Sequence, residues 1–139
     1  VYTLGWSEIF GFSSGSIGDL NGDGVNDLVV GAIWDDDGGW GVSNAGAVYV
    51  MFMTTNGLID SAQKISNSYG GLSSFYSLGS SNFGMSVSAS DDVDGDGVKD
   101  MVVGAHYDDD GGTQAGAVYV IFMNGCGPPD ACSQCPGHS

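Results

Sequence analysis

The sequence repeats itself once, and this repeat constrains the fold more than any other feature. The matching pairs, at an offset of 73 positions, are Phe10-Gly11 with Phe83-Gly84 and residues 19–32 (DLNGDGVNDLVVGA) with residues 92–105 (DVDGDGVKDMVVGA). A third pair, residues 45–53 and 115–123, has an offset of 70, because the first copy carries three extra residues in a loop. Insertions in loops are tolerated, so the chain uses one supersecondary unit twice.

Each unit contains short apolar runs that are rich in Val, Tyr, Phe and Met and end at Gly or Asp, which favours strands over helices. Residues 28–33 and 48–53 are apolar on both alternating faces, which predicts sheets that are covered on both sides. The expected strands are 10–17, 27–33, 46–53 and a weaker 63–66 in the first unit, and 83–90, 100–106 and 116–123 in the second.

These strands predict an all-β fold of two four-stranded antiparallel units, the second of them incomplete. The predicted divisions are residues 1–72 for the first unit with its connecting loop, 73–123 for the second unit, and 124–139 for a Cys-, Pro- and Gly-rich tail or linker. Val1 opens the sequence without a signal-like stretch, so we expect a trimmed, mature or partial chain. No apolar run approaches the ~20 residues of a membrane span, so direct membrane insertion is not expected.

The charge of the chain is strongly acidic. There are 17 Asp and Glu residues against 2 Lys and Arg, for a formal net charge of -15. This imbalance excludes nucleic acid and anionic membrane surfaces as partners, because both are held through Lys and Arg. The expected binding partner of such an acidic chain is a cation. With 42% hydrophobic residues, the chain should nevertheless fold.

Two acidic loops have the ligand spacing of a metal site. Oxygen side chains stand at loop positions 1, 3, 5 and 9, and a Gly at position 6 permits the tight turn that brings them together. Such hard oxygen ligands suit Ca²⁺, with the carbonyl of residue 7 as a backbone ligand, whereas zinc or iron would require His or Cys. The predicted calcium ligands are Asp19, Asn21, Asp23, Val25 and Asp27 in the first loop and Asp92, Asp94, Asp96, Val98 and Asp100 in the second.

Other interpretations of these loops fit less well. An EF-hand needs a bidentate Glu at position 12, where this chain has Val30 and Val103. Plain Asp-Gly turns would leave several close carboxylates repelling one another. Two Asp triplets, residues 35–37 and 108–110, follow the next strand about 20 Å away. For them, further calcium binding, a cation bridge to a neighbour and an exposed turn all stay open.

The repeated unit resembles the FG-GAP repeat, the blade unit of integrin alpha-subunit β-propellers. The residues that carry the resemblance are Phe10-Gly11, the 19–27 loop and Gly31-Ala32, then Phe83-Gly84, the 92–100 loop and Gly104-Ala105. The resemblance implies propeller-type blades with calcium in the loop between the first two strands. Asn21 departs from the usual Asp, and Ile33 and His106 replace the usual Pro.

Two blades do not close a propeller, since closure takes about four to eight. The partners that we expect are therefore further FG-GAP blades, of the same chain or of neighbouring chains in a homo-oligomer or filament. The expected function is adhesion or structural self-assembly outside the cell or at its surface. The alternative is a carbohydrate-binding module with glycans as partners, and aromatic Trp34, Trp40 and Tyr107 in acidic loops are compatible with one.

Chemistry other than calcium binding has little support in the sequence. His106 stands beside an Asp triplet, but no nucleophile pattern such as GxSxG accompanies it, so we do not expect an enzyme. Cys126, Cys132 and Cys135 predict a disulfide, with one cysteine left for a partner elsewhere. Together with His138 their spacing is too compressed for a zinc knuckle. The Ser runs are candidate O-glycan sites, with turns as the default interpretation.

Overall fold

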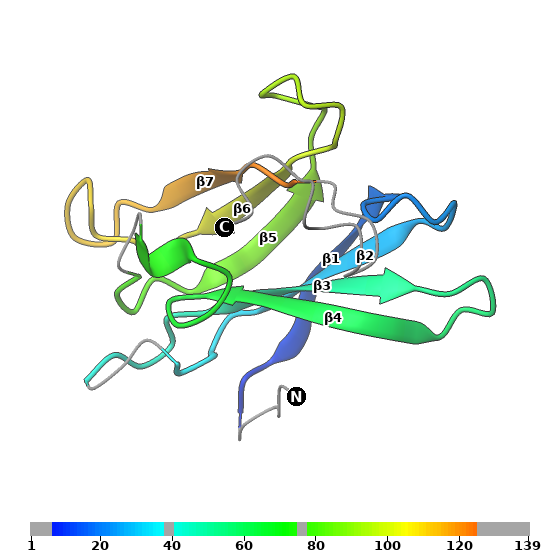
Figure 1. Ribbon diagram of the computed structural model, residues 1–139. Helices are drawn as coiled ribbons and strands as arrows, with labels where there is room; N and C mark the ends of the chain where they lie inside the picture. The colour runs from blue at the N-terminus through cyan, green and yellow to red at the C-terminus, as the bar shows by residue number, and fades with distance from the viewer. Residues whose placement is uncertain (1–6, 38–40, 75–77, 125–139) are drawn as a thin grey trace.

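The computed structural model describes residues 7–37, 41–74 and 78–124. Within these ranges seven strands and one short 3-10 helix, η1 (Leu72–Ser74), form two antiparallel sheets (Figure 1). The predicted all-β fold is therefore confirmed. Over the same ranges no helix has the length and apolar character needed to cross a membrane. Trp40, His138 and the three cysteines, with their predicted disulfide, lie outside the described residues.

The first sheet has four strands in the order β1-β2-β3-β4. Their bounds are Phe10–Gly18 for β1, Asp27–Ala32 for β2, Ala47–Met53 for β3 and Ile59–Ser66 for β4. The register pairs Val29 with Val50 and Val48 with Ile65. β4 begins earlier than predicted, because its first half is exposed and Asp60 and Ser61 interrupt the apolar signal of a strand.

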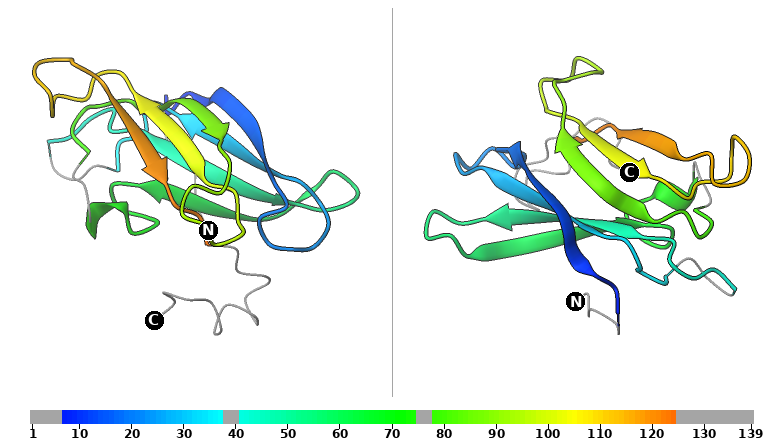
Figure 2. Two further views of the ribbon diagram at one scale, coloured as in Figure 1. Left: turned by 90° about the horizontal axis from the view of Figure 1, so that it is seen from above. Right: turned by 180° about the vertical axis from the view of Figure 1, so that it is seen from behind.

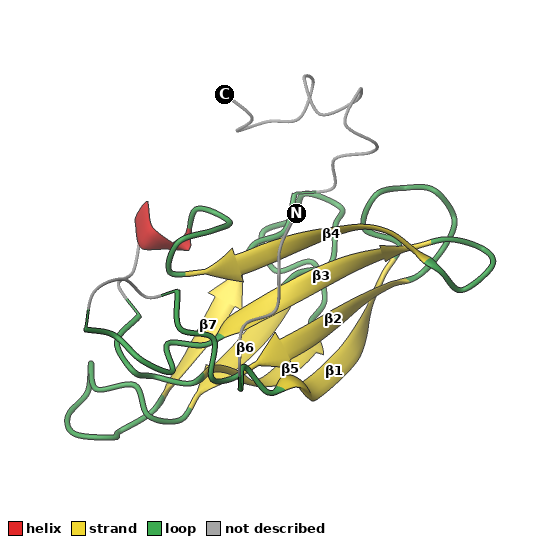
Figure 3. Ribbon diagram, turned by 90° about the horizontal axis from the view of Figure 1, so that it is seen from below, coloured by secondary structure: helices red, strands yellow, loops and turns green. Residues whose placement is uncertain are grey.

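The second sheet has three strands in the order β5-β6-β7, with bounds Phe83–Ala89 for β5, Met101–Ala105 for β6 and Ala117–Ile121 for β7. Its register repeats that of the first sheet, since Val102 pairs with Val120 and Gly104 with Val118. No described strand pairs with the outer edge of β7, as expected from the sequence. Figure 3 shows the loops gathered at the two ends of the strands.

The two sheets stack face to face, with β5 packed across β1 and β2 (Figure 2). This geometry buries one face of each sheet in a shared apolar core. Burial of such side chains is the main stabilising term of folding. The side chains that meet include Val29, Val48, Val50 and Ile65 from the first sheet and Val87, Met101, Val103 and Tyr119 from the second.

The outer faces of the two sheets differ. On the first sheet, a second apolar cluster is buried around Val30 and Tyr49. On the second sheet, Val118, Val120 and Phe122 are 71%, 44% and 54% exposed. No described segment covers this face of the second sheet, so its expected covering by further blades stays a prediction. Alternate residues of β7 point to a face on which no described segment packs.

Candidate metal centre

Each acidic loop joins the first two strands of its sheet. The first loop connects β1 to β2, and the second connects β5 to β6. Gly24 and Gly97, at the sixth loop position, have φ values of +85° and +91°. A side chain at these positions would be strained, so glycine lets each loop reverse the chain. The repeat thus places the predicted ligands at equivalent corners of the two sheets.

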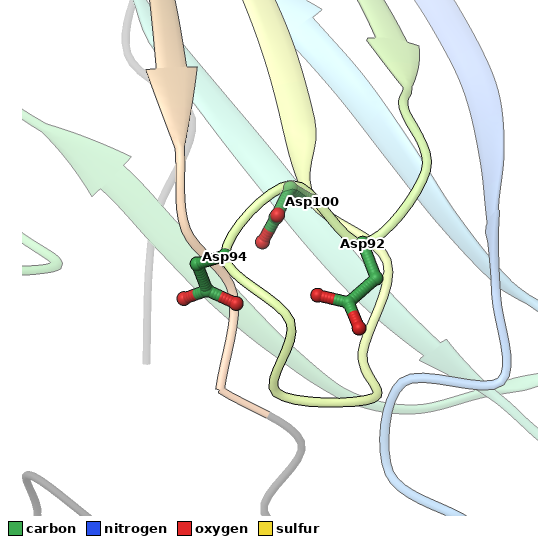
Figure 4. Close-up of side chains that lie close together, drawn as sticks. All are labelled: Asp92, Asp94 and Asp100. Atoms are coloured by element: carbon green, nitrogen blue, oxygen red, sulfur yellow. The ribbon is translucent and has the colours of Figure 1, made fainter.

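The second loop brings three carboxylates together. Ligand oxygens of Asp92, Asp94 and Asp100 all lie within 4.8 Å of one another (Figure 4). Asp92 and Asp94 are exposed, whereas Asp100 is fully buried. Three negative charges at this separation repel, and a hard cation removes the repulsion. The donor set therefore fits a divalent cation with oxygen ligands.

Backbone N–H groups hold the loop around Asp92. Its carboxylate accepts hydrogen bonds from Gly97 N at 2.7 Å, Gly95 N at 2.6 Å and Asp96 N at 3.0 Å. These hydrogen bonds, above all the one from Gly97, lower the pKa of Asp92. Asp92 is consequently kept as an anion at the centre of the loop.

The pKa of Asp94 is shifted in the opposite direction. Desolvation raises its pKa, and the nearby negative charges of Asp96, Asp100 and Asp92 raise it further. The anionic form of Asp94 is therefore less favoured than that of Asp92, and a cation nearby would favour it. This electrostatic imbalance is a further property of a cation site.

Asp100 anchors the loop to the sheet. Its Oδ2 accepts a hydrogen bond from Val93 N at 2.7 Å, and its Oδ1 accepts one from Met123 N at 3.0 Å. One buried carboxylate thus joins the start of the loop, the start of β6 and the chain just after β7. Any cation held by Asp100 would be coupled directly to the edge of the second sheet.

The first loop has the same backbone network but a different side-chain arrangement. Asp19 accepts hydrogen bonds from Gly22 N, Asp23 N and Gly24 N at 2.7, 3.0 and 2.8 Å. Asn21 Nδ2 donates to Asp23 Oδ2 at 3.1 Å, so an amide partly satisfies a carboxylate there. In the described chain, the close group of three carboxylates occurs in the second loop alone.

The buried Asp27 of the first loop repeats the role of Asp100. Its Oδ2 accepts a hydrogen bond from Leu20 N at 2.9 Å and its Oδ1 accepts one from Met53 N at 3.0 Å. The structure thus draws together three of the predicted ligands of the second loop, while Asp96 accepts a hydrogen bond from Val98 N instead. The ligand roles of the two loops and the identity of the ion stay predictions.

The first Asp triplet is an internal ion-pair site. Lys64 Nζ lies 2.7 Å from Asp35 Oδ2 and 2.8 Å from Asp37 Oδ2. Tyr49 Oη donates to Asp35, and Ser66 Oγ donates to Asp37 at 2.7 Å. The interpretation as an exposed turn is wrong for Asp35, which is fully buried. The signal missed in the sequence is Lys64, one of two basic residues and a member of a predicted strand.

The second triplet has no such cation among the described residues. Asp108 is buried and accepts a hydrogen bond from Tyr119 Oη. Its Oδ1 accepts a hydrogen bond from Asp110 N at 2.9 Å. The fourth strand that carries Lys64 in the first sheet has no described counterpart here, which explains the difference.

Two of the aromatic residues that the sequence makes compatible with glycan binding line a hollow formed by loops of the two sheets. Trp34 and Tyr107, 41% and 44% exposed, line a space of about 350 Å³. Polar side chains complete its lining, namely Asn44, Ser80, Asn82, Asp109 and Gln114. The ring of His106 packs against Tyr107, with 3.8 Å between the ring centroids and an interplanar angle of 34°. An aromatic surface with amide and carboxylate groups beside it suits a polar ligand with apolar faces.

Comparison with known proteins agrees with this architecture. A model of the FG-GAP repeat matches residues 11–51 and 83–121. The two matches contain both acidic loops, most of β1 to β3, and the whole of β5 to β7. The resemblance stated from the sequence is therefore confirmed.

The related curated proteins are integrin alpha chains. Integrin alpha pat-2 of Caenorhabditis elegans is 38% identical over 97 residues, which are 69% of this chain and 7% of the relative. Integrin alpha-E of Mus musculus is 36% identical over 97 residues, 69% of this chain and 8% of the relative. Integrin alpha ina-1 of C. elegans is 38% identical over 122 residues, 81% of this chain and 10% of the relative. The chain thus spans a tenth or less of the length of these relatives.

Proposed function

The chain belongs to the FG-GAP repeat family, and from this premise we propose that it is a calcium-binding module of an extracellular or cell-surface protein that acts in adhesion or structural assembly. The relatives named integrin alpha support the adhesive role. Further FG-GAP blades, in the same or in neighbouring chains, are its immediate partners. In this proposal the chain supplies a surface and a scaffold and carries out no reaction.

The close carboxylates of Asp92, Asp94 and Asp100 carry the calcium proposal. Ca²⁺ takes six to eight oxygen ligands in flexible geometry, and a loop with oxygen side chains at alternate positions provides them. The proposed ligands are the ten residues predicted from the sequence, five from each loop. When bound, the ion supplies positive charge, and the loop residues hold it.

The calcium has a structural role in this proposal. Asp27 connects its loop to the end of β3 through Met53 N, and Asp100 connects its loop to the chain just after β7 through Met123 N. An ion bound at the loop therefore stabilises the corner where three strands meet. Binding to the folded state alone raises the free energy of unfolding, by about 2.7 kcal/mol at an ion concentration of a hundred times Kd.

Thermal unfolding in calcium, in magnesium and in EDTA tests this proposal. We expect calcium to raise the melting temperature of the chain more than magnesium does. Asp94→Asn should reduce the calcium-dependent shift, whereas Asp60→Asn, at an exposed position in β4, should leave it unchanged. A melting temperature independent of calcium, or equal effects of the two substitutions, would contradict the proposal.

Carbohydrate binding is a second candidate function, and the hollow beside Trp34 and Tyr107 favours it. Sugars present apolar faces that stack on aromatic rings and hydroxyl groups that bond to amides and carboxylates. Binding to a glycan panel should then be saturable and should be lost in Trp34→Ala but kept in Leu58→Ala, an exposed position in the β3–β4 turn. Equal binding by both variants would exclude this hollow.

A further inference from the structure

The two sheets of the chain meet through a Phe-Gly segment that fits into a glycine-lined socket. Phe83 N donates to Ala45 O at 2.9 Å, and Phe83 also forms an isolated parallel bridge with Gly46. Ser13 Oγ donates to Gly84 O at 2.7 Å. Phe83 itself is fully buried. This contact fixes the second sheet on the first.

The socket depends on two glycines of the first sheet. A Cβ atom added to Gly31 would lie 2.1 Å from Gly84 O, and one added to Gly46 would lie 2.1 Å from Phe83 O. Real Cβ atoms do not approach a backbone oxygen this closely, so both positions must lack a side chain. The glycines therefore allow the backbone of β5 to lie directly against the first sheet.

The repeat places the same socket on the outer face of the second sheet. Gly104 corresponds to Gly31 and Gly116 to Gly46, at the offsets of 73 and 70 positions. There a cavity of about 410 Å³ is lined by Ser86, Gly104, Ala115, Gly116, Ala117 and Val118, among others. Val48 is fully buried beneath the second sheet, whereas its counterpart Val118 is 71% exposed. The socket of the second sheet is therefore formed, and none of the described segments fills it.

The repeat also places the matching Phe-Gly segment on the first sheet. Phe10 is 39% exposed, and a Cβ added to Gly11 would meet no atom within 4 Å. The backbone is already in the docking conformation, since Gly11 has a φ of +92° against +93° for Gly84. The Phe10 ring packs edge-on against Tyr49 at 5.3 Å, as Phe83 packs against Tyr119 at 5.4 Å.

We propose that Phe10-Gly11 of one chain docks into the Gly104–Gly116 socket of a second copy, repeating the contact between the two sheets within each chain. This inference rests on the assembly part of the proposed function and names its partner and its surface. Both surfaces are apolar around the contact, with Phe12 and Leu28 exposed on one side and Val120 and Phe122 on the other. Such burial favours association.

The contact joins two different surfaces, so it is heterologous and does not close after two copies. Each added chain presents the same open socket again. The assembly therefore becomes a ring if the rotation between copies closes, and a fibre if it does not. In either case the copies are arranged head to tail with one repeated interface.

Two complementary variants test the proposal. Phe10→Ala removes the docking side chain but keeps the socket, and Val118→Glu places a charge in the socket but keeps Phe10. Loss of a central aromatic anchor weakens an interface by about tenfold or more. We expect the unchanged chain to form concentration-dependent oligomers in sedimentation velocity, and each variant alone to sediment as a monomer.

Mixing the two variants gives the decisive result. Each pair then has one intact Phe-Gly segment and one intact socket, so the mixture should form dimers that grow no further. Leu58→Glu, the same kind of charge at a 65% exposed position in a distant turn, should assemble like the unchanged chain. Circular dichroism on each variant verifies that the sheets are retained.

A monomeric unchanged chain at all concentrations would overturn the proposal, as would a mixture that stays monomeric. Oligomers of Phe10→Ala alone equal to those of the unchanged chain would also overturn it, because another surface would then be responsible. Calcium binding measured on the same samples separates the docking proposal from the calcium proposal. A monomer that still binds calcium leaves the calcium proposal standing and removes only the docking.

Discussion

Lys64 Nζ lies 2.7 Å from the carboxylate of Asp35, and both side chains are buried where β4 passes the loop after β2. Asp37 lies 2.8 Å from the same ammonium group. In a chain with a net charge of -15, one of the two basic residues is thus used inside the fold. Burial alone would lower the pKa of Lys64, but hydrogen bonds to Asp35 and Asp37 outweigh it and raise the pKa.

Replacement of this lysine should destabilise the first sheet. Lys64→Met leaves two buried or half-buried carboxylates without a cation, and removing one partner of a buried ion pair costs about 3 kcal/mol or more. The exposed Lys99→Met, which makes the same change of charge, should cost about 0.5 kcal/mol or less. Urea unfolding at saturating calcium measures both. Equal losses would contradict a structural role for the ion pair.

Alkaline pH should weaken the same region. Burial raises the pKa of Tyr49 from 10.0 to about 12. The protonated phenol is favoured in the folded state, so its contribution to stability is complete below about pH 10 and is lost as the pH rises through 12. The phenolate absorbance should therefore contain a late component that Tyr49→Phe removes. A titration curve of unchanged shape in that variant would contradict this expectation.

The docking geometry predicts unequal effects at two equivalent glycines. Gly31→Ala forces a Cβ against the backbone oxygen of Gly84, which should cost about 2–3 kcal/mol by overpacking. At the equivalent Gly104, the nearest atom is the Ser86 hydroxyl at 2.5 Å, and a hydroxyl can rotate away. Gly104→Ala should therefore be much less destabilising in urea. Similar midpoints for the two variants would mean that the sheets do not approach this closely.

Much of the fold could be predicted because the sequence contains the same structural unit twice. Matching apolar runs located the strands, and the acidic loops and their glycines located the turns. The first half of β4 was missed, since exposed polar residues such as Asp60 give no strand signal. The burial of Asp35 was missed as well, because it depends on Lys64 from a strand far along the chain.

The close group of three carboxylates in the second loop could be predicted from the sequence, whereas the different side-chain arrangement of the first loop could not. Ligand spacing is a property of the sequence, so Asp92, Asp94 and Asp100 could be named in advance. That Asn21 donates to Asp23 in the other loop depends on side-chain conformation, which spacing does not determine. The open socket likewise required the structure, since it follows from which face of the second sheet is covered.

The two loops should differ in affinity for calcium because of one residue. Asn21→Asp gives the first loop the ligand charges of the second, and an added ligand charge should tighten calcium binding by about tenfold. The reverse change, Asp94→Asn, should weaken the second loop by a similar factor. Calorimetric titration of both variants measures these shifts. If Asn21→Asp leaves both affinities unchanged, residue 21 is not a ligand.

If both acidic loops bind calcium, as we propose, the number of ions bound per chain must show it. Isothermal titration of the calcium-free chain should give two calcium ions per chain, and Asp19→Asn combined with Asp23→Asn should leave one. Magnesium at the same concentrations should bind more weakly, because it requires stricter geometry. Absence of calcium binding, or an unchanged stoichiometry in the double variant, would contradict the claim.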